Sequence, residues 1–261
     1  MISPLRNSKF LHGSPPSTRG TPTGDPTGTS TTTLRIAETF VSRQGEGSLT
    51  GTDSFFIRTS GCNLRCWFCD TPYASWRPEG APQSIDSLQK AAIDAKVEHV
   101  VLTGGEPLLP LESSTLTEAL RSIGLHVTIE TAGTVDRDVQ CDLMSISPKF
   151  RSSTPDRTKH PRWHELHQKR RMPIDTMRRL IDRSDDYQVK FVVDAPTDLE
   201  ELLEVTSALA VPKEKVWVMP QGITPEELDK ASMWLSEWTD SQGFRYCDRM
   251  HIHWYGNRRG T

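Results

Sequence analysis

The sequence predicts a mixed α/β fold in which parallel strands alternate with helices and form a partial (β/α)6-type barrel. Three observations lead to this prediction. From residue 84 onward, segments with the apolar spacing of a helix alternate with short apolar runs, which is typical of βα units joined by right-handed crossovers. The run Val100-Val101-Leu102 suits a strand buried on both faces. Polar or glycine-bearing segments follow the ends of four strands, where the functional loops of a parallel barrel lie.

The first 33 residues have a different composition from the rest of the chain. Ser, Thr, Pro and Gly dominate residues 1–33, and large apolar side chains are few. Such a segment cannot bury enough apolar surface to offset its chain entropy. The sequence therefore predicts a disordered extension, followed by one folded domain over residues 34–261.

Within this domain the expected elements follow from apolar spacing. The first two strands show the alternation of a half-buried sheet, and the segment after Ser84 has apolar residues at helical spacing with Ser84 as a suitable N-cap. The expected order is strand 34–40, strand 54–59, helix 84–95, strand 97–102, helix 114–123, strand 125–130, strand 142–147, helix 174–183, strand 187–193, helix 197–209, strand 215–219, helix 224–241 and strand 245–254.

Residues 148–173 form an insertion between two expected strands, with Pro, Arg, His and Trp but little periodicity. His160, His164 and His167 could suggest a metal site. The segment around them is basic and interrupted by proline, so an exposed lid is the better interpretation. The run 169–171, Lys-Arg-Arg, is expected to form a solvated basic face.

The last residues of the chain carry further candidates. His251 and His253 are two residues apart, and on the strand expected at 245–254 they would share one face and pack in the core or at its rim. The basic tail that ends at Thr261 is expected either to be loose or to fold over an anionic ligand.

Composition excludes several classes of protein. The 31 Lys and Arg residues nearly balance the 34 Asp and Glu residues, so the charge does not indicate a nucleic-acid partner. No run of about 18 apolar residues and no secretory signal core is present, which indicates neither a membrane span nor export. Five cysteines, three of them clustered, fit the reducing cytoplasm. Cys141 and Cys247 stand alone and are expected to be small core residues.

Cys62, Cys66 and Cys69 form a C-x3-C-x2-C motif on one short loop. Soft thiolate ligands select iron–sulfur clusters, Zn2+ or Cu(I). Structural zinc sites use four protein ligands, and no second pair stands elsewhere to complete one. A [4Fe–4S] cluster held by three cysteines leaves one iron open to bind a substrate or cosubstrate. The motif therefore indicates a catalytic cluster, with buried structural thiols as the alternative.

These cysteines, with the aromatic Phe68 before the third, resemble the signature of the radical S-adenosylmethionine (SAM) superfamily. In that superfamily SAM chelates the open iron, and one-electron reduction splits it into methionine and a 5′-deoxyadenosyl radical. The resemblance implies a [4Fe–4S] cluster, SAM and a one-electron donor such as flavodoxin or ferredoxin. It also implies that the partial barrel is a radical SAM barrel.

Within the superfamily, residues 34–261 resemble the 7-carboxy-7-deazaguanine synthase (QueE) family. The motifs that carry the resemblance are 44–47 (Gln-Gly-Glu-Gly), 56–66 with the first two cysteines, 69–71 (Cys-Asp-Thr), 103–107 (Thr-Gly-Gly-Glu-Pro), 147–149 (Ser-Pro-Lys) and 219–222 (Met-Pro-Gln-Gly). The implied reaction is ring contraction of 6-carboxy-5,6,7,8-tetrahydropterin to 7-carboxy-7-deazaguanine, with loss of ammonia and regeneration of SAM. The family acts as a homodimer.

The resemblance also implies the residues of the site. The cluster ligands would be Cys62, Cys66 and Cys69, and Thr71 would bind Mg2+. The SAM contacts would be Phe68, Cys69, Asp70, Gly105, Ser147, Pro148, Lys149, Met219, Pro220, Gln221 and Gly222. The substrate contacts would be Arg43, Gln44, Gly45, Arg58, Thr103 and Thr261, the last through the terminal carboxylate.

Elementary chemistry agrees with these roles. The paired glycines at 104–105 let a backbone approach the methionine end of SAM, and Glu130 offers acceptors for ribose hydroxyls. Backbone groups flanking Gln221 can pair with an adenine edge. Arg58 offers a bidentate fork for a carboxylate, and the Gln44 amide can pair with the pterin.

Two other functions remain open at this point. A glycyl-radical activating enzyme shares the cysteine spacing but acts on a protein, and the Gln-Gly-Glu-Gly loop argues against it. An electron-transfer or zinc-binding module without catalysis would use the same thiols. Reductant-dependent formation of 5′-deoxyadenosine by the reconstituted protein would exclude the second of these.

Overall fold

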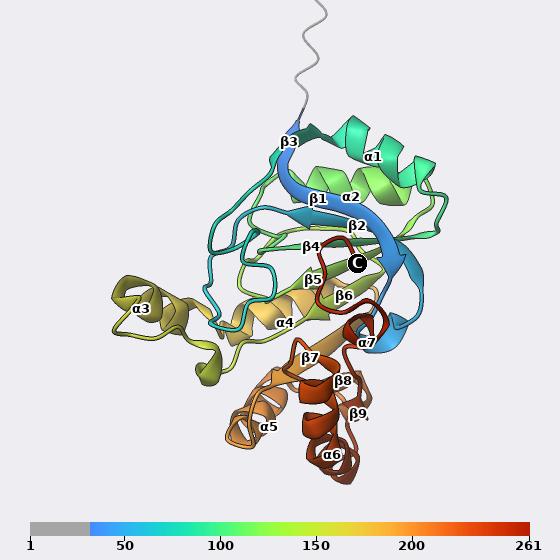
Figure 1. Cartoon of the computed structure of the whole chain (residues 1–261). Helices are drawn as coiled ribbons and strands as arrows, with labels where there is room; N and C mark the ends of the chain where they lie inside the picture. Colours follow the sequence, from blue (N-terminus) through green and yellow to red (C-terminus); the bar gives the residue numbers. More distant parts are fainter. Residues whose placement is uncertain (1–31) are drawn as a thin grey trace, which may run out of the picture. The chain divides into compact units, whose positions relative to one another are not determined.

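The computed structural model describes residues 32–261, so the predicted extension lies almost wholly outside this part of the chain. In the described part nine strands form one sheet in the order β3-β1-β2-β4-β5-β6-β7-β8-β9 (Figure 1). The strands are β1 (Thr33–Arg43), β2 (Asp53–Thr59), β3 (Ala81–Ser84), β4 (His99–Gly104), β5 (His126–Thr131), β6 (Leu143–Ile146), β7 (Tyr187–Val193), β8 (Val216–Pro220) and β9 (Arg245–Tyr246).

From β2 to β9 every neighbouring pair of strands is parallel, which confirms the predicted parallel α/β fold. Two pairings were not predicted: β1 is antiparallel to β2, and the short strand β3 is antiparallel to β1. Pro82 lies in β3, where the edge position tolerates a residue without an N–H. The parallel register places Arg58 beside Thr103 and Thr59 beside Gly104.

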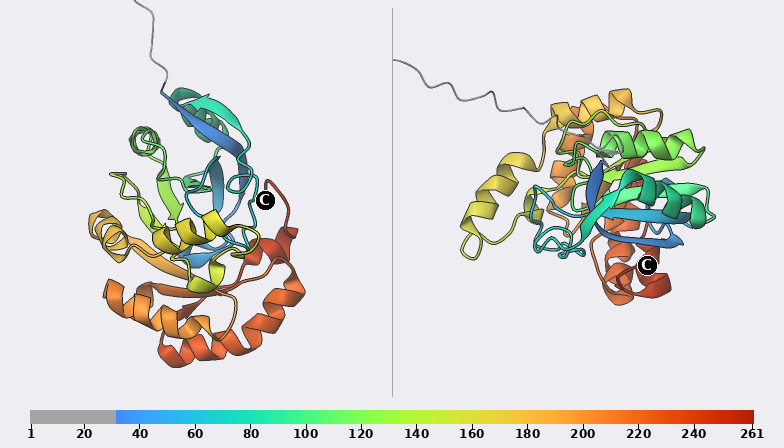
Figure 2. Two further views of the ribbon diagram at one scale, coloured as in Figure 1. Left: turned by 90° about the vertical axis from the view of Figure 1, so that its left-hand side faces the viewer. Right: turned by 90° about the horizontal axis from the view of Figure 1, so that it is seen from above.

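The helices are α1 (Ile85–Asp94), α2 (Ser113–Ser122), α3 (Pro161–Arg170), α4 (Ile174–Arg183), α5 (Asp198–Leu209), α6 (Pro225–Gln242) and α7 (Met250–Tyr255), with short 3-10 turns η1 (Gly47–Leu49), η2 (Arg151–Ser153) and η3 (Lys213–Lys215). Helices α1, α2, α4, α5 and α6 lie on the outer side of the curved sheet, whereas α3 projects away from it and α7 lies near the C-terminus (Figure 2). The Ser84 hydroxyl accepts from the amide N–H of Ser87, so the predicted N-cap of α1 is confirmed. Most predicted bounds agree within two residues.

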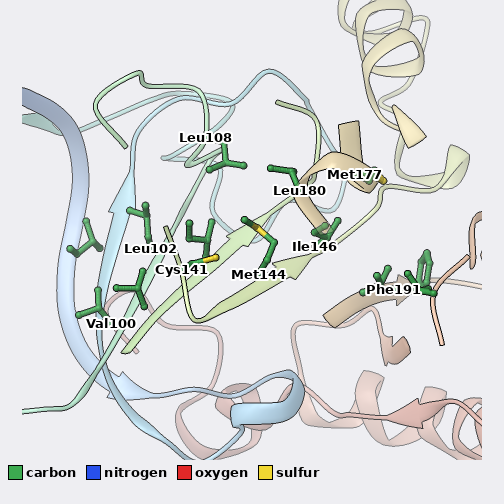
Figure 3. Close-up of a cluster of buried hydrophobic side chains, with 14 of the residues drawn as sticks. Val100, Leu102, Leu108, Cys141, Met144, Ile146, Met177, Leu180 and Phe191 are labelled. Atoms are coloured by element: carbon green, nitrogen blue, oxygen red, sulfur yellow. The ribbon is translucent and has the colours of Figure 1, made fainter. Parts of the chain in front are cut away.

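The core fills the space between the sheet and these helices (Figure 3). Side chains from the strands, such as Leu102 and Phe191, and from the helices, such as Leu180, are fully buried. Cys141 packs among them, and Cys247 is buried as well, so the prediction that both are small core residues is confirmed. This core holds the strand ends that carry the candidate site.

The strand predicted over 245–254 is wrong. Only Arg245–Tyr246 pairs with the sheet, and residues Met250–Tyr255 form the short helix α7. The amide of Met250 donates to the Gly45 carbonyl, which ties α7 to the loop after β1. His251 and His253 therefore do not share a strand face. The segment is rich in residues that favour strands, and this contact with a distant loop outweighs that preference.

The insertion at 148–173 is more ordered than an exposed lid. It contains η2 and α3, and Pro161 occupies the first turn of α3, a position that favours proline. His167 is fully buried, and Arg171, expected on a solvated face, is buried and paired with Glu201 at 2.5 Å. Lys169 is exposed, as predicted.

The three histidines of the insertion do not form a metal site. The Nδ1 atom of His167 accepts from the backbone N–H of Arg65 at 3.2 Å, and its Nε2 atom lies 2.9 Å from the Ser153 hydroxyl. Both ring nitrogens are thus hydrogen-bonded, one to the backbone of the cysteine loop and the other to η2. Within residues 32–261, no three His, Cys, Asp or Glu side chains are arranged to hold a single metal ion.

His167 gives the fold a testable pH dependence. Burial, aided by the cations of Arg171 and Lys149, lowers the pKa of His167 from 6.5 to about 4. Between pH 6.5 and 4 the unfolded chain therefore binds a proton at this histidine that the folded chain does not bind. The free energy of unfolding falls as the pH drops through this window. The expected loss is about 3 kcal/mol. Urea denaturation at pH 7 and pH 4 should show a smaller difference for His167→Gln; an unchanged difference would contradict the assignment.

Within the described residues, no helix combines the length and the apolar character that a membrane span requires.

Candidate active site

A cavity of about 520 Å3 opens at the carboxyl ends of the parallel strands. A volume of this size is typical of small-molecule sites. Among the residues predicted for the site, all but Pro148, Pro220 and Gly222 line this cavity. The loops after β1, β2, β4, β5, β6 and β8 thus bring together residues that are far apart in the sequence, as predicted for the rim of a parallel barrel.

The three thiols of the cysteine motif face this cavity and are free of disulfides. Burial raises the pKa of Cys62 to about 12, with a contribution from the Glu106 carboxylate, and burial raises the pKa of Cys66 to about 11, partly offset by the Lys149 cation. The Cys62 and Cys66 thiols are therefore neutral at pH 7 without a metal, and their binding to one would release protons. The Cys69 sulfur also lies 3.1 Å from the Ser75 hydroxyl.

The cysteine loop is held from behind by the insertion. The Arg65 guanidinium donates to the carbonyls of Cys62 and Leu64 and stacks 3.9 Å from the centre of the Trp163 ring. The Trp76 indole donates to the Cys66 carbonyl at 2.9 Å. These bonds occupy the backbone carbonyls of the loop, so its shape is fixed before any cluster binds.

The Gln-Gly-Glu-Gly loop also lines the cavity and is anchored on β7. Gly47 has φ +73°, and a Cβ there would lie 2.4 Å from the Gln188 amide, so both the backbone and the space favour glycine. The Gln188 side chain accepts from the N–H of Ser48 and donates to the Ser145 hydroxyl. Gln44 is buried and donates to Ser54 at 3.0 Å. The loop is therefore a fixed wall of the cavity.

Glu46 is the centre of a buried ionic network. Its carboxylate pairs with Lys190 at 2.5 Å and with Arg249 at 3.1 Å, and the His251 ring lies 3.9 Å away. Burial raises the pKa of Glu46, but the charges of Lys190 and Arg249 outweigh this and hold the pKa well below its usual range. Lys190 also lies 3.5 Å from Glu130, so the carboxylate predicted to bind the SAM ribose already has a cationic neighbour.

Arg249 joins three loops of the site. Besides Glu46, its guanidinium donates to the Asp70 carboxylate, which follows Cys69, and to the Gly222 carbonyl at 2.7 Å. Burial raises the pKa of Asp70, but the charge of Arg249 outweighs this and keeps the pKa below its usual value. Gly222 thus supports the site from behind the cavity wall.

Arg58 is held in place by Glu38. The Glu38 carboxylate accepts from the Arg58 Nε at 2.7 Å, from the Tyr73 hydroxyl at 2.7 Å, and from Arg259 at 3.1 Å. Within the described residues, the terminal amino groups of Arg58 make no hydrogen bond, and the residue lines the cavity. Arg58 therefore presents a pre-oriented cationic group to any ligand. Arg43 differs, because its guanidinium bonds Tyr255 and stacks on Trp254.

The paired glycines at 104–105 meet the start of the cysteine loop. A Cβ on Gly105 would lie 2.2 Å from the Gly61 carbonyl oxygen and 2.5 Å from that of Ala74, so no side chain fits. The next residue, Glu106, is fully buried and accepts from the Thr131 hydroxyl and the Ala132 amide. Glu106 thus fastens the loop after β4 to the loop after β5.

Replacing Gly105 by Ala is expected to lower the free energy of unfolding by about 1–3 kcal/mol, because the added carbon overpacks against two backbone carbonyls. SAM affinity should fall at least tenfold, because the turn must move away from its present place. Calorimetric titration of SAM into the reconstituted protein measures this. In Gly124→Ala the new carbon meets no atom within 4 Å, and the φ of +84° adds backbone strain at a residue that does not line the cavity. SAM affinity should therefore be retained there; equal SAM affinity in both variants would contradict the prediction.

Several residues of the site escaped prediction. Lys190, Arg249, His251, Tyr73 and Ser75 all line the cavity. For Lys190 a signal was available, since it is a charged residue in the middle of the apolar run of β7. No comparable signal marks Arg249, whose partners come from segments near residues 46, 70 and 222.

Comparisons with known proteins agree with this geometry. The Radical SAM superfamily model matches residues 56–151. A 7-carboxy-7-deazaguanine synthase from Rhodopirellula baltica is 58% identical over 232 residues, covering 89% of this chain and 90% of the relative. The chain belongs to the 7-carboxy-7-deazaguanine synthase family.

Other members of the 7-carboxy-7-deazaguanine synthase family match over similar lengths. A synthase from Halobacterium salinarum is 43% identical over 230 residues, covering 84% of this chain and 89% of that one. The crystal structure of QueE from Escherichia coli superposes with a TM-score of 0.61 at 23% identity, covering 83% of this chain and 93% of that one. At this identity the likeness concerns the fold, which is the predicted radical SAM barrel.

Proposed function

We propose that this radical SAM enzyme converts 6-carboxy-5,6,7,8-tetrahydropterin to 7-carboxy-7-deazaguanine by ring contraction with release of ammonia. The observation that carries the proposal is the meeting of two motifs in one cavity. The three thiols of the cysteine loop and the Gln-Gly-Glu-Gly loop line the same space of about 520 Å3. A radical source and a wall suited to a planar polar substrate therefore face each other.

The residues present fit the proposed cofactors. Three free thiols line one wall, and a cluster spreads its ligands over several irons, so the thiolates need not converge on one point. Gly105, where no side chain fits, leaves backbone groups for the methionine end of SAM. Phe68, Ser147, Met219 and Gln221 line the cavity as further SAM contacts. When bound, the cluster and SAM supply the 5′-deoxyadenosyl radical that removes a hydrogen atom from the carbon bearing the carboxylate.

The chain's own residues bind and orient the substrate. Arg58, fixed by Glu38, offers its terminal amino groups to the pterin carboxylate. Thr103 is the cross-strand partner of Arg58 and adds a hydroxyl at the same depth. Gln44 and Gly45 offer amide groups to the pterin ring, and Thr261 lines the same cavity. Arg43 contributes through its backbone, because its guanidinium is engaged by Tyr255.

A Mg2+ ion at Thr71 is a further part of the proposal. The Thr71 hydroxyl lines the cavity, 3.8 Å from the Cys69 sulfur. Mg2+ keeps most of its shell as water and substrate oxygen, so a single protein oxygen suffices to place it. The ion would fix a substrate oxygen close to the radical source.

We further propose a homodimer that acts in a reducing compartment, where thiols remain available for a cluster. Light scattering coupled to gel filtration measures the mass of the native protein. A mass near 58.8 kDa, twice the chain mass of 29.4 kDa, supports the dimer, and a mass near 29.4 kDa refutes it.

Conversion of the carboxypterin by the anaerobic protein tests the activity. With SAM, dithionite and Mg2+, the wild type should form 7-carboxy-7-deazaguanine, and Cys66→Ala should form none. A zinc or electron-transfer module would give no product with either protein. Deoxyadenosine formed without any turnover of the pterin would instead favour an activating enzyme that acts on a protein.

A further inference from the structure

The chain ends in a short segment that lies against the cavity. Residues 256–261, the tail, follow α7 and contain no helix or strand. Asn257, Arg258 and Thr261 line the cavity. Terminal residues are poorly ordered in most domains unless a specific contact ties them down. A contact with the folded domain must therefore hold the tail at the cavity.

The Arg259 side chain makes this contact. Its Nε donates to the Glu38 carboxylate at 3.1 Å, one terminal nitrogen donates to the Glu79 carboxylate at 2.9 Å, and the other donates to the Ala37 carbonyl at 3.2 Å. The guanidinium also lies 4.1 Å from the centre of the Tyr73 ring, within the range of a cation–π contact. All three nitrogens of this guanidinium are thus engaged by the folded domain.

The tail has no second point of attachment of this kind. Within the described part of the chain, the hydrogen bonds from residues 257–261 to residues outside the tail all come from the Arg259 guanidinium. The hydrogen bonds of Arg258 and Thr261 stay within the tail. Figures 1 and 2 show the tail beside the end of the sheet that holds β1 and β2. Its place there depends on one side chain.

Glu38 connects the tail to the proposed substrate contact. Its Oε2 accepts from Arg259, while its Oε1 accepts from the Arg58 Nε and from the Tyr73 hydroxyl, each at 2.7 Å. The side chains of Glu38 and Arg58 are 12% and 14% exposed, whereas that of Arg259 is 46% exposed. One carboxylate therefore bridges a buried arginine that lines the cavity and an exposed arginine that belongs to the tail.

We propose that Arg259 is a positioning residue for the substrate, because it holds the tail at the cavity and, through Glu38, orients Arg58. The inference rests on the proposed function, in which Arg58 binds the pterin carboxylate. Without Arg259 the Glu38 carboxylate can turn, so the guanidinium of Arg58 loses its fixed direction. The tail loses its attachment at the same time, so Thr261 no longer lines the cavity. The substrate must then order both groups as it binds, which costs affinity.

The test compares Arg259→Met with a matched change elsewhere. Arg259→Met removes the charge and the three hydrogen bonds of the guanidinium. Arg245→Met is the control, because Arg245 is also exposed, lies 5.4 Å from the centre of the Trp217 ring and does not line the cavity. Arg259→Lys keeps a cation that can still pair with Glu38 and lie over Tyr73, so it should restore part of the function.

Steady-state kinetics with the carboxypterin measure the positioning role. Arg259→Met should raise KM at least tenfold and change kcat less than about threefold, because the lost interactions act equally on the bound substrate and on the transition state. Arg259→Lys should bring KM back to within about threefold of wild type, where Arg245→Met also stays. A variant that is only destabilised would instead lower kcat through its smaller active fraction and keep its KM. Formation of 5′-deoxyadenosine without pterin should be the same in all these proteins.

Digestion by carboxypeptidase Y measures the attachment of the tail without any pterin. Glu79→Lys places a second cation beside Arg259 but leaves the tail sequence unchanged, and Glu79 is 56% exposed and does not line the cavity. Loss of Thr261, followed by mass spectrometry of the intact protein, should be at least threefold faster in Glu79→Lys than in wild type. Glu118→Lys, the same charge reversal on an exposed residue of α2, should be digested at the wild-type rate.

Two results would overturn the proposal. A KM of Arg259→Met within threefold of that of Arg245→Met would show that Arg259 does not position the substrate. Equal digestion of Glu79→Lys and wild type would show that Arg259 does not hold the tail. Failure of the wild type to turn over the pterin would refute the proposed function but leave the digestion result standing, so the two proposals fail separately.

Discussion

Replacing Arg249 by Met is expected to lower the free energy of unfolding by about 1–3 kcal/mol. The Arg249 side chain is 8% exposed and pairs with both Asp70 and Glu46. Met fills much of the same volume but removes one of the two cations beside the Glu46 carboxylate, which is 16% exposed, and the cation of the Asp70 carboxylate, which is 35% exposed. A largely buried acceptor that loses its partner costs about 1–3 kcal/mol. Because Arg249 also bonds the Gly222 carbonyl, the loops that carry the proposed cluster and SAM contacts should loosen, and turnover should fall with stability.

Urea denaturation of the anaerobic protein measures this change. Lys90→Met is the matched control, because it removes a cation from the Lys90–Asp94 pair, whose side chains are 75% and 62% exposed. Exposed pairs of this kind contribute little, so the control should lose less than about 0.5 kcal/mol. Equal free energies of unfolding for Arg249→Met and Lys90→Met would show that the ionic network around Glu46 does not stabilise the fold as its geometry indicates.

Replacing Arg58 by Gln is expected to lower kcat/KM for the carboxypterin by about 10²- to 10³-fold. This corresponds to about 3–4 kcal/mol, the range observed when one partner of a buried, hydrogen-bonded charge pair is removed. The loss arises because Glu38 holds the Arg58 Nε and leaves a planar pair of terminal donors to face the carboxylate. Arg58→Lys should recover little activity, since an ammonium cannot bind in a bidentate manner.

Steady-state kinetics under anaerobic conditions test this prediction. Arg35→Gln is the control, because Arg35 is exposed and donates to the Pro78 and Gly80 carbonyls outside the cavity. The production of 5′-deoxyadenosine without pterin should be similar in the wild type, Arg58→Gln and Arg35→Gln. This measurement separates substrate binding from SAM cleavage. A kcat/KM of Arg58→Gln within threefold of that of Arg35→Gln would show that Arg58 does not contact the substrate.

The fold was predictable where local pattern and burial act together. The strand β4 is apolar on both faces over most of its length, and the predicted helices have apolar residues at helical spacing, so parallel βα units follow from the sequence. The helix α3 was missed because it is polar on most of its surface, and its stability comes from Trp163 on Arg65 and from buried His167. Such contacts have no periodic signature.

The site was predictable where it depends on short motifs and not where it depends on distant pairs. The cysteine loop, the paired glycines and the Gln-Gly-Glu-Gly loop are each readable as local sequence. The ionic network is different, since Glu46, Asp70, Lys190 and Arg249 come from four separate segments. Asp70 was predicted as a SAM contact and Glu46 lies in the Gln-Gly-Glu-Gly motif, but neither motif indicated the pairing. Of the two residues that were missed, only Lys190 carried a signal, because a buried strand seldom contains a lysine without a partner.

The central claim is that the cysteine loop and the Gln-Gly-Glu-Gly loop place two reactants within one cavity. These are SAM and the pterin carbon that bears the carboxylate. The most direct test of this claim uses substrate deuterated at the carbon that bears the carboxylate, incubated with the reconstituted protein, SAM and dithionite. We predict that deuterium appears in recovered SAM while 7-carboxy-7-deazaguanine accumulates. Formation of product with no deuterium in SAM or in 5′-deoxyadenosine would contradict the claim.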